Sequence, residues 1–147
     1  MKISRISLFI ATLGPIGYMI ASGTVATIIS VPFMYWLRQL FPNTIQYGFF
    51  VMGFSVISLL AIGSALKQLR RLDDPSEIIL DEVVGCLVTF CGIPLSAQSI
   101  IIGLILVGFL GILKNGQVTN WAVNEWTIIL DDVVVGILVN ITLRCIF

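Results

Sequence analysis

The sequence predicts an all-α membrane protein, a polytopic helix bundle of about four to five transmembrane segments with an N-terminal interfacial or re-entrant helix. Two observations lead to this fold class. Hydrophobic residues make up 58% of the chain and charged residues 11%, and the mean hydropathy of +1.07 lies well above that of soluble proteins. In addition, residues 45–66 and 83–113 carry no charge, and roughly 20 apolar residues suffice to cross the hydrocarbon of a bilayer.

The first charge-free run has the length of one span, whereas the second is too long for one and is expected to contain two. It breaks at Gly92 and Pro94, because glycine lowers helix stability and proline lacks a backbone donor. Gly14 and Pro15 interrupt the N-terminal run at 6–20, which we expect to lie in the interface or to dip into the bilayer. The predicted spans cover residues 25–41, 45–66, 78–93, 96–113 and 128–147. The third span is short, so we expect it to thin the bilayer locally or to be buried among its neighbours.

The basic residues predict the orientation of these segments. With a cytoplasmic N-terminus, most of the Lys and Arg residues fall inside, as the positive-inside rule expects. An N-terminal segment that crosses on its own is the alternative arrangement. The residues predicted to lie inside are Lys2, Arg5, Lys67, Arg70, Arg71 and Lys114, and those outside are Arg38 and Arg144. The chain is therefore expected to be an integral membrane protein, with its polar chemistry on the cytoplasmic face.

Composition also excludes several classes of function. We interpret residues 1–147 as one domain, because no stretch is long and polar enough for a separate aqueous domain. A formal net charge of zero provides no basic surface for nucleic acid. The chain has no histidine, and its three cysteines lack the spacing of a metal site. The N-terminal segment is similar to a signal peptide, but nothing exportable and soluble follows it, so we interpret it as a retained membrane segment.

Two acidic motifs stand out in this apolar chain. "DPSEIILDEVVG" ends at Gly85, and "IILDDVVVG", which has similar apolar flanks, ends at Gly136. Asp81 and Asp132 each precede the final glycine by one helical turn, so each carboxylate and its glycine lie on nearly the same helix face. Such glycines let two membrane helices approach closely. The pattern therefore predicts that the two acidic pairs come together.

Four carboxylates are the predicted metal ligands: Asp81, Glu82, Asp131 and Asp132. Carboxylates inside membrane helices are tolerated when they are paired, hydrated or bound to a cation. Magnesium is the expected cation, because it takes carboxylate oxygens, keeps several waters and is usually completed by substrate phosphate. Acidic residues at a helix start also simply complement the helix dipole. This plainer interpretation is favoured for Asp73, Asp74 and Glu77, which lie in or beside a polar loop.

Phosphate-binding candidates lie in "ASGTVATII" and beyond the fourth predicted span. Ser22 or Thr24 is expected to cap a helix, and the exposed amides at Gly23 and Thr24 suit an anion. A plain helix cap without phosphate is the alternative. Lys114 is expected either to pair with the carboxylates or to hold a phosphate. In the predicted topology all of these groups lie at the cytoplasmic end of the helices.

The strings "SGTVAT", "DPSEIILDEVVG" and "ILDDVVVG", in this order, make almost the whole chain resemble the bacterial phosphatidylglycerophosphatase A family. The resemblance implies a small, magnesium-dependent lipid phosphatase of the inner membrane. Such an enzyme removes the terminal phosphate of phosphatidylglycerophosphate and leaves phosphatidylglycerol. The resemblance also implies functional or supporting roles for Gly23, Thr24, Asp74, Pro75, Asp81, Glu82, Gly85, Asp131, Asp132 and Gly136.

The mechanism expected from this resemblance is metal-assisted hydrolysis of a phospholipid at the membrane interface. Magnesium held by the four carboxylates would polarise the phosphoryl group, and one carboxylate would orient the attacking water. Direct attack by an aspartate, which gives a phosphoenzyme, remains the alternative. Lys114 and the amide at Thr24 would hold phosphate oxygens, while the acyl chains stay among the membrane lipids.

The chain departs from the family pattern between its two acidic motifs. The family usually has a string like "RxFDxxKPxP", where this chain reads "GFLGILKNGQ". Lys114 is kept, but Gly108 replaces the arginine and Gly111 the aspartate. One alternative is therefore a catalytically inactive or altered-substrate relative. A small ion or solute transport protein that uses the carboxylates is the less favoured one, because transport sites usually lie near the midplane of the membrane.

Overall fold

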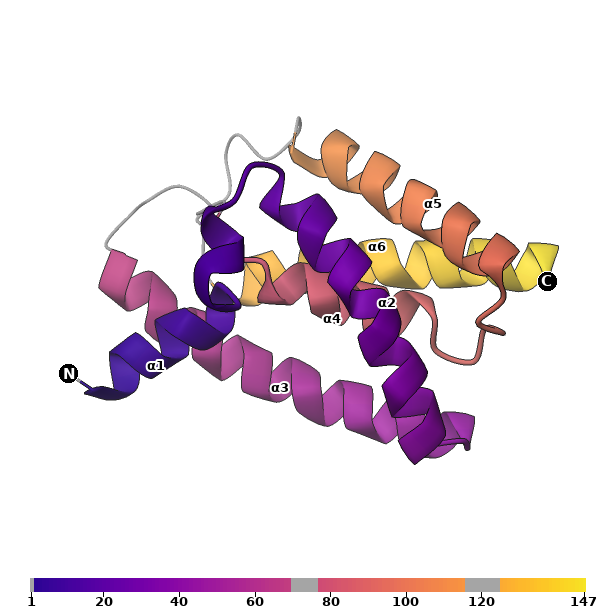
Figure 1. Cartoon of the computed structure of the whole chain (residues 1–147), viewed down its shortest axis with the longest axis horizontal. Helices are drawn as coiled ribbons and strands as arrows, with labels where there is room; N and C mark the ends of the chain where they lie inside the picture. The colour runs from indigo at the N-terminus through magenta and orange to yellow at the C-terminus, as the bar shows by residue number, and fades with distance from the viewer. Residues whose placement is uncertain (1, 70–76, 116–124) are drawn as a thin grey trace.

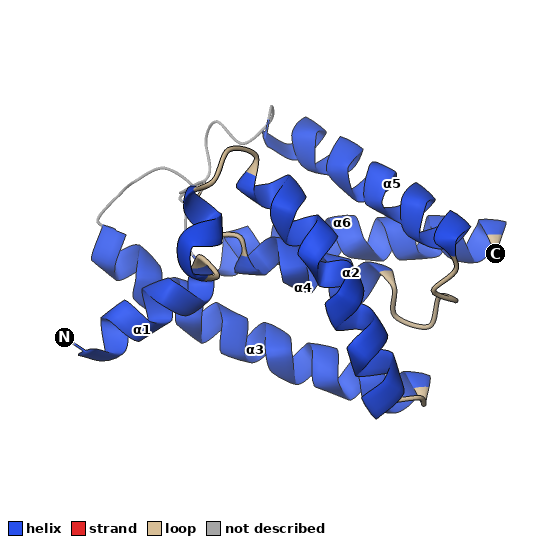
Figure 2. Ribbon diagram, in the orientation of Figure 1, coloured by secondary structure: helices blue, strands red, loops and turns tan. Residues whose placement is uncertain are grey.

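The computed structural model describes residues 2–69, 77–115 and 125–147. These residues form six α-helices and one short 3-10 helix, and none of them lies in a β-strand (Figure 2). The prediction of an all-α fold is confirmed. In chain order the elements are α1 (Lys2–Ala11), η1 (Gly14–Tyr18), α2 (Ser22–Leu40), α3 (Thr44–Leu69), α4 (Leu80–Thr89), α5 (Ala97–Asn115) and α6 (Glu125–Ile146).

The helix breaks fall where glycine and proline predict them. After α1 the chain turns through Leu13 and Gly14, both with positive φ, and Pro15 lies in the first turn of η1. Gly92, with φ of +76°, lies in the connection between α4 and α5. A Cβ at Gly92 would lie 2.6 Å from the Arg144 guanidinium, so this turn requires glycine for its conformation and for its space.

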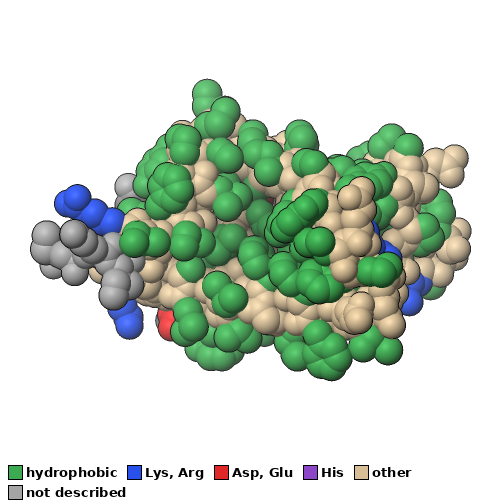
Figure 3. Space-filling model, turned by 60° about the horizontal axis from the view of Figure 1, so that its bottom comes forward, with side chains coloured by type: hydrophobic (Ala, Val, Ile, Leu, Met, Phe, Trp, Pro, Cys, Tyr) green, Lys and Arg blue, Asp and Glu red, His purple; other side chains and the backbone are tan. Residues whose placement is uncertain are grey.

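Within the described part of the chain, two helices are long and apolar enough to cross a membrane. The apolar stretches are Thr44–Lys67 in α3 and Glu125–Ile146 in α6, and the shorter apolar stretch Ala97–Leu113 lies in α5. Hydrophobic side chains cover most of the face in Figure 3, and the charged side chains seen there lie toward its two ends. A surface of this kind is typical of a protein whose middle contacts lipid. The number of crossings and the depth of the N-terminal helix stay predictions.

Helix α4 is short and lies in the centre of the bundle, against α2, α3, α5 and α6 (Figure 1). Its 10 residues span about 15 Å, roughly half the thickness of the hydrocarbon. Eight of them are buried. For the third predicted span we expected either local thinning of the bilayer or burial among the neighbouring helices. The structure shows burial.

Helices α4 and α6 run parallel and pack closely at two glycines. A Cβ at Gly136 would lie 2.6 Å from the backbone oxygen of Gly85, and one at Gly85 would lie 3.0 Å from the backbone oxygen of Asp132. The prediction that these glycines let the two helices approach is confirmed. Because Asp132 lies opposite Gly85, the second acidic pair is shifted along the axis by about one turn from Asp81.

The C-terminal end of α4 is satisfied by side chains from two neighbouring helices. Arg38 on α2 donates to the carbonyls of Phe90 and Ile93, at 3.0 and 2.8 Å. Asn140 on α6 donates to Thr89 and Cys91, at 2.7 and 2.9 Å. Since the last carbonyls of a helix have no partner within it and carry partial negative charge, these donors stabilise a helix end inside the bundle.

The close contact at Gly136 generates a first prediction, on stability. We expect Gly136→Ala to lower the free energy of unfolding by about 1–3 kcal/mol, because the added methyl group meets backbone that does not move aside easily. Gly53→Ala in α3 is the matched control, since a Cβ there has nothing within 4 Å. Thermal unfolding of both variants in detergent checks the difference, and equal stability of the two would contradict the proposed contact.

Candidate active site

The first acidic pair lies in the first turn of α4. Asp81 is buried and Glu82 is partly buried. The turn before this helix is held by a hydrogen bond of 3.1 Å, in which the amide of Ile79 donates to the carbonyl of Ala11 at the end of α1. Both carboxylates are therefore fixed at the positive end of the α4 dipole, where a negative charge is favoured.

The start of α2 lies against this acidic pair. A Cβ at Gly23 would overlap the carboxylate of Glu82, so only glycine leaves room for that side chain. The structure thus brings "SGT" and the first acidic motif together, as the predicted topology requires. The carboxylate also lies beside the first-turn amides of α2, which have no partner within their own helix.

One detail of the predicted helix cap is wrong. Ser22 or Thr24 was expected to cap α2, but the residue at the cap position is Ala21, which has a left-handed φ of 57° and makes no side-chain cap. Ser22 is buried in the first turn, and Thr24 is exposed. Because alanine has no side-chain hydroxyl, the cap position of α2 offers no side-chain hydrogen bond to the first turn. The carboxylate of Glu82 lies beside that turn instead.

The second acidic pair, on α6, lies beside the first but at a different depth. Asp131 and Asp132 are both partly buried, and the Cβ of Asp132 lies 3.2 Å from the position of a Cβ at Gly85. Asp132 on α6 therefore lies beside the stretch of α4 that follows the first acidic pair.

The four predicted ligands do not form one compact cage. Among the residues that the structure describes, no group of three or more His, Cys, Asp or Glu side chains is gathered so that it could hold a metal ion. The axial offset of α4 and α6 accounts for this, because Asp132 lies opposite Gly85 and not opposite Asp81. The assignment of Asp81, Glu82, Asp131 and Asp132 as magnesium ligands stays a prediction.

Several predicted site residues lie outside the described part of the chain. Asp74 and Pro75, together with Asp73, fall in residues 70–76, and the side chain of Lys114 is likewise not described. Gly108 and Gly111 are described, on the C-terminal half of α5, and a Cβ at either position has nothing within 4 Å. Larger side chains at these two positions have space.

Comparison with protein-family models gives one match, to the model described as "Phosphatidylglycerophosphatase A", over residues 9–147. The chain belongs to the phosphatidylglycerophosphatase A family. No curated protein and no solved structure matches the chain. Membership of the phosphatidylglycerophosphatase A family supports a lipid phosphatase of phospholipid biosynthesis, with phosphatidylglycerophosphate as the substrate that the family name implies.

The polar groups at the C-terminal end of α4 were not among the site residues predicted from the sequence. Asn140 follows Gly136 by one turn, and Arg144 follows Asn140 by another, so the three lie along one face of α6. An asparagine that follows an apolar stretch of α6, on the same face as a packing glycine, is the signal that would have found them, because polar side chains often bond across membrane helices.

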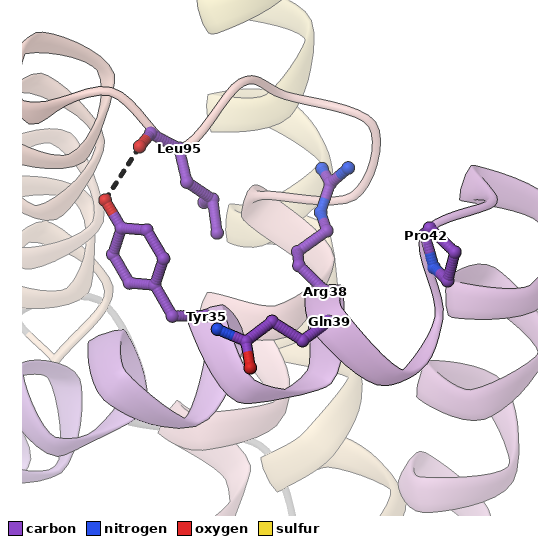
Figure 4. A pocket seen from close by; sticks show the side chains of 5 residues that line it. All are labelled: Tyr35, Arg38, Gln39, Pro42 and Leu95. Carbon is purple, nitrogen blue, oxygen red and sulfur yellow. Dashed lines mark hydrogen bonds between the residues drawn. The ribbon is translucent and has the colours of Figure 1, made fainter.

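A shallow hollow of about 370 Å³ lies at this far end, lined by Tyr35, Arg38, Gln39, Pro42 and Leu95 (Figure 4). The Tyr35 hydroxyl donates to the carbonyl of Leu95 at 2.7 Å. Arg38, the only cation of its lining, already donates to two carbonyls and lies over the Tyr47 ring. The hollow is remote from the acidic motifs and offers no free positive charge for a phosphate, so we do not assign the chemistry to it.

The contact between Gly23 and Glu82 generates a second prediction. We expect Gly23→Ala to lower phosphatidylglycerophosphate hydrolysis by at least about tenfold, because the new methyl group displaces the Glu82 carboxylate. The melting temperature should change little, since the displaced atoms are the end of a flexible side chain. Phosphate release and thermal unfolding, measured on the same preparation beside Gly53→Ala, check this. If Gly23→Ala has the activity of the unmodified chain, the prediction that Gly23 belongs to the site is wrong.

Proposed function

We propose that this chain hydrolyses the terminal phosphate of phosphatidylglycerophosphate to give phosphatidylglycerol, with magnesium, at the cytoplasmic face of a bacterial inner membrane. The observation that carries the proposal is the meeting of three motif segments on α2, α4 and α6. Gly23 lies against Glu82, and Asp132 lies against Gly85. The segments that resemble the family motifs are thus neighbours in space, at the start of α4 for Gly23 and in the middle of α4 for Asp132.

The charges on the surface support the proposed orientation. Exposed Arg5 on α1 and Lys67 near the end of α3 belong to the end of the molecule where α4 and α6 begin (Figure 1). Arg38 and Arg144, the exceptions to the positive-inside pattern, donate to backbone carbonyls near the end of α4. A structural role therefore explains these two arginines, and the remaining basic residues favour a cytoplasmic acidic end.

The N-terminal elements are suited to the membrane interface. Arg5, Ile6 and Phe9 on α1 are exposed, and so are Tyr18 and Ile20 at and after η1. A short helix that presents basic and large apolar side chains is typical of segments that lie in the headgroup region. In this arrangement α1 and η1 would keep the acidic end of the bundle at the level of the lipid phosphates.

The donor chemistry of the acidic end fits magnesium. The candidate ligands Asp81, Glu82, Asp131 and Asp132 supply only carboxylate oxygens, which hard cations prefer. Magnesium is usually held by one or two carboxylates together with substrate phosphate, and not by a cage of protein ligands alone. A pair of acidic motifs offset by one turn suits that kind of binding, which the substrate completes. When bound, the ion would polarise the phosphoryl group and balance its negative charge.

The position of Glu82 bears on phosphate binding. The first-turn amides of α2 suit an anion, but the carboxylate of Glu82 lies beside Gly23 there. A phosphate at Gly23 and Thr24 would therefore face a second negative charge. This repulsion is relieved when a cation lies between the two groups, which is a further reason to place the metal-binding carboxylates beside the phosphate-binding turn.

The residues of the chain then have distinct roles in hydrolysis. The amides at Gly23 and Thr24, with Lys114, would hold phosphate oxygens, and a carboxylate of the acidic pairs would accept a proton from the attacking water. The water oxygen bonds to phosphorus, the bond to the glycerol oxygen breaks, and that oxygen takes up a proton. Attack by an aspartate carboxylate, followed by hydrolysis of the phosphoenzyme, uses the same residues.

A second candidate is an inactive or altered-substrate relative, which the open space on α5 favours. A Cβ at Gly108 or Gly111 has nothing within 4 Å, so α5 has room for the arginine and aspartate that the family pattern has there. Both positions lie in the C-terminal half of α5. Loss of one guanidinium and one carboxylate from such a site removes groups that stabilise charge during phosphoryl transfer.

A third prediction tests the metal mechanism. We expect Asp81→Asn to lower magnesium-dependent phosphate release from phosphatidylglycerophosphate by about 100-fold or more, because a ligand charge is lost beside the reacting phosphate. Glu125→Gln is the matched control, since it neutralises a partly buried carboxylate that starts α6 and packs against Gly63. An equal rate of phosphate release with and without magnesium, and in the unmodified chain and Asp81→Asn, would contradict the metal mechanism.

A fourth prediction separates the two candidates. If the chain is an active phosphatase, Gly108→Arg combined with Gly111→Asp raises its phosphate release only modestly. If it is an inactive relative, well-folded protein releases no phosphate, and activity appears in the double variant. Phosphatidic acid and phosphatidylglycerophosphate, assayed side by side, distinguish an altered substrate from a loss of turnover.

A further inference from the structure

The carboxylates depend on how α4 is placed along α6, and the glycine contact alone does not fix that placement. Gly85 and Gly136 let the two helices approach closely, but neither glycine has a side chain that would interlock with the other helix. Between apolar helices in lipid, such contacts rest on van der Waals packing without a strong axial preference. A directional interaction is needed to specify one register, as a buried asparagine does in coiled coils.

Asn140 supplies such an interaction. Its side-chain amide donates to the carbonyls of Thr89 at 2.7 Å and Cys91 at 2.9 Å, beyond the last intrahelical partners of α4. Its side-chain oxygen accepts a bond of 2.8 Å from the Nε of Arg144, which also donates to Cys91 at 3.0 Å. A slip of α4 by one turn would break the bonds from Asn140 and Arg144 to the carbonyls of Thr89 and Cys91, and would leave these carbonyls unsatisfied.

The same register sets the spacing of the acidic pairs. Asn140 lies about 12 Å along α6 from Asp132, and α4 is a single ten-residue helix from Leu80 to Thr89. An axial shift at the C-terminal end of α4 therefore moves Asp81 and Glu82 by the same amount. A misplacement of about 1 Å at reacting groups lowers rates by roughly 100-fold.

We propose that Asn140, held by Arg144, is a positioning residue that sets the axial register of α4 against α6 and thereby the spacing of the catalytic carboxylates. The catalytic part of this proposal rests on the proposed function, whereas the register part does not. Asn140 does not touch the substrate in this proposal. It acts through α4, from the opposite end of that helix.

The register is tested without any activity measurement, by disulfide trapping. The test protein carries Gly85→Cys and Asp132→Cys, whose Cβ positions are 3.2 Å apart, near the separation of about 3.8 Å in disulfides, and its native cysteines are replaced by alanine. Every protein compared carries this same cysteine pair, so any separation of the helices that a side chain at Gly85 causes is common to all of them, and the comparison reports the effect of position 140. We expect added Asn140→Leu to slow trapping by at least about tenfold, because the aligned register is populated less. Thr142→Val is the matched control, since the exposed Thr142 hydroxyl bonds only to Leu138 of its own helix among the bonds described.

The link to catalysis is tested in the native background with Asn140→Leu and Thr142→Val. We expect Asn140→Leu to lower kcat and to raise the magnesium concentration for half-maximal rate, each by about tenfold, while KM for the lipid changes little. A variant that only folds in lower yield would lose rate at an unchanged magnesium requirement. Thr142→Val should retain the values of the unmodified chain.

Each outcome decides the proposal or one part of it. Equal trapping with and without Asn140→Leu overturns the register role, whatever the activity. Slower trapping with unchanged kcat and magnesium requirement overturns the link to the carboxylates. If the unmodified chain releases no phosphate, the proposed function fails, and trapping still decides the register. Should the first cysteine pair prevent folding, Val88→Cys with Gly136→Cys, also 3.2 Å apart, replaces it.

Discussion

The close approach of α4 and α6 at Gly85 and Gly136 is the contact on which the rest of this structure depends. It places the backbone of Asp132 against the helix that carries Asp81 and Glu82. A side chain at either glycine would push the two helices apart, because the atoms it would meet are backbone oxygens. In an apolar environment, where burial of apolar area does not drive helices together, such small residues are what permit tight packing.

The two ends of α4 are both stabilised by charge. At its start Asp81 and Glu82 lie at the positive end of the helix dipole, and at its end the guanidinium of Arg38 lies near the negative end. Helix α2 reaches both ends, since Gly23 meets Glu82 and Arg38 meets Phe90. A helix too short to cross a membrane is thus held inside the bundle with its terminal groups satisfied.

The groups that stabilise α4 and the groups proposed for catalysis lie at different positions along the axis of this helix. Hydrogen bonds to backbone carbonyls gather at the far end of α4, and the acidic motifs gather at its start. In the proposed function this separation is useful, because a headgroup at the interface would meet the carboxylates while the acyl chains would contact the apolar helix faces. The family match covers residues 9–147, and a Cβ at Gly108 or Gly111 on α5 has nothing within 4 Å.

The sequence by itself determined the helical class, the breaks at Gly14 and Gly92, the family, and the closeness of α4 and α6. Charge-free apolar runs, breaks at glycine and proline, and the spacing of Asp132 and Gly136 are local, so they can be read from neighbouring residues. Placement along a neighbouring helix is not local. Spacing within a motif says which face a carboxylate occupies but not its axial offset from another helix, so the one-turn shift between the acidic pairs came only from the tertiary structure.

Burial of α4 was also decided by the tertiary structure. Hydropathy does not distinguish a short buried helix from a membrane span, because both are apolar, and the fate of Ile78 to Ile93 was left open between the two. The partners of Arg38, Asn140 and Arg144 became visible only when the carbonyls at the end of α4 were placed beside them. Hydrogen bonds to main-chain carbonyls leave no pattern in the sequence of the segment that accepts them, since every residue carries the same carbonyl group.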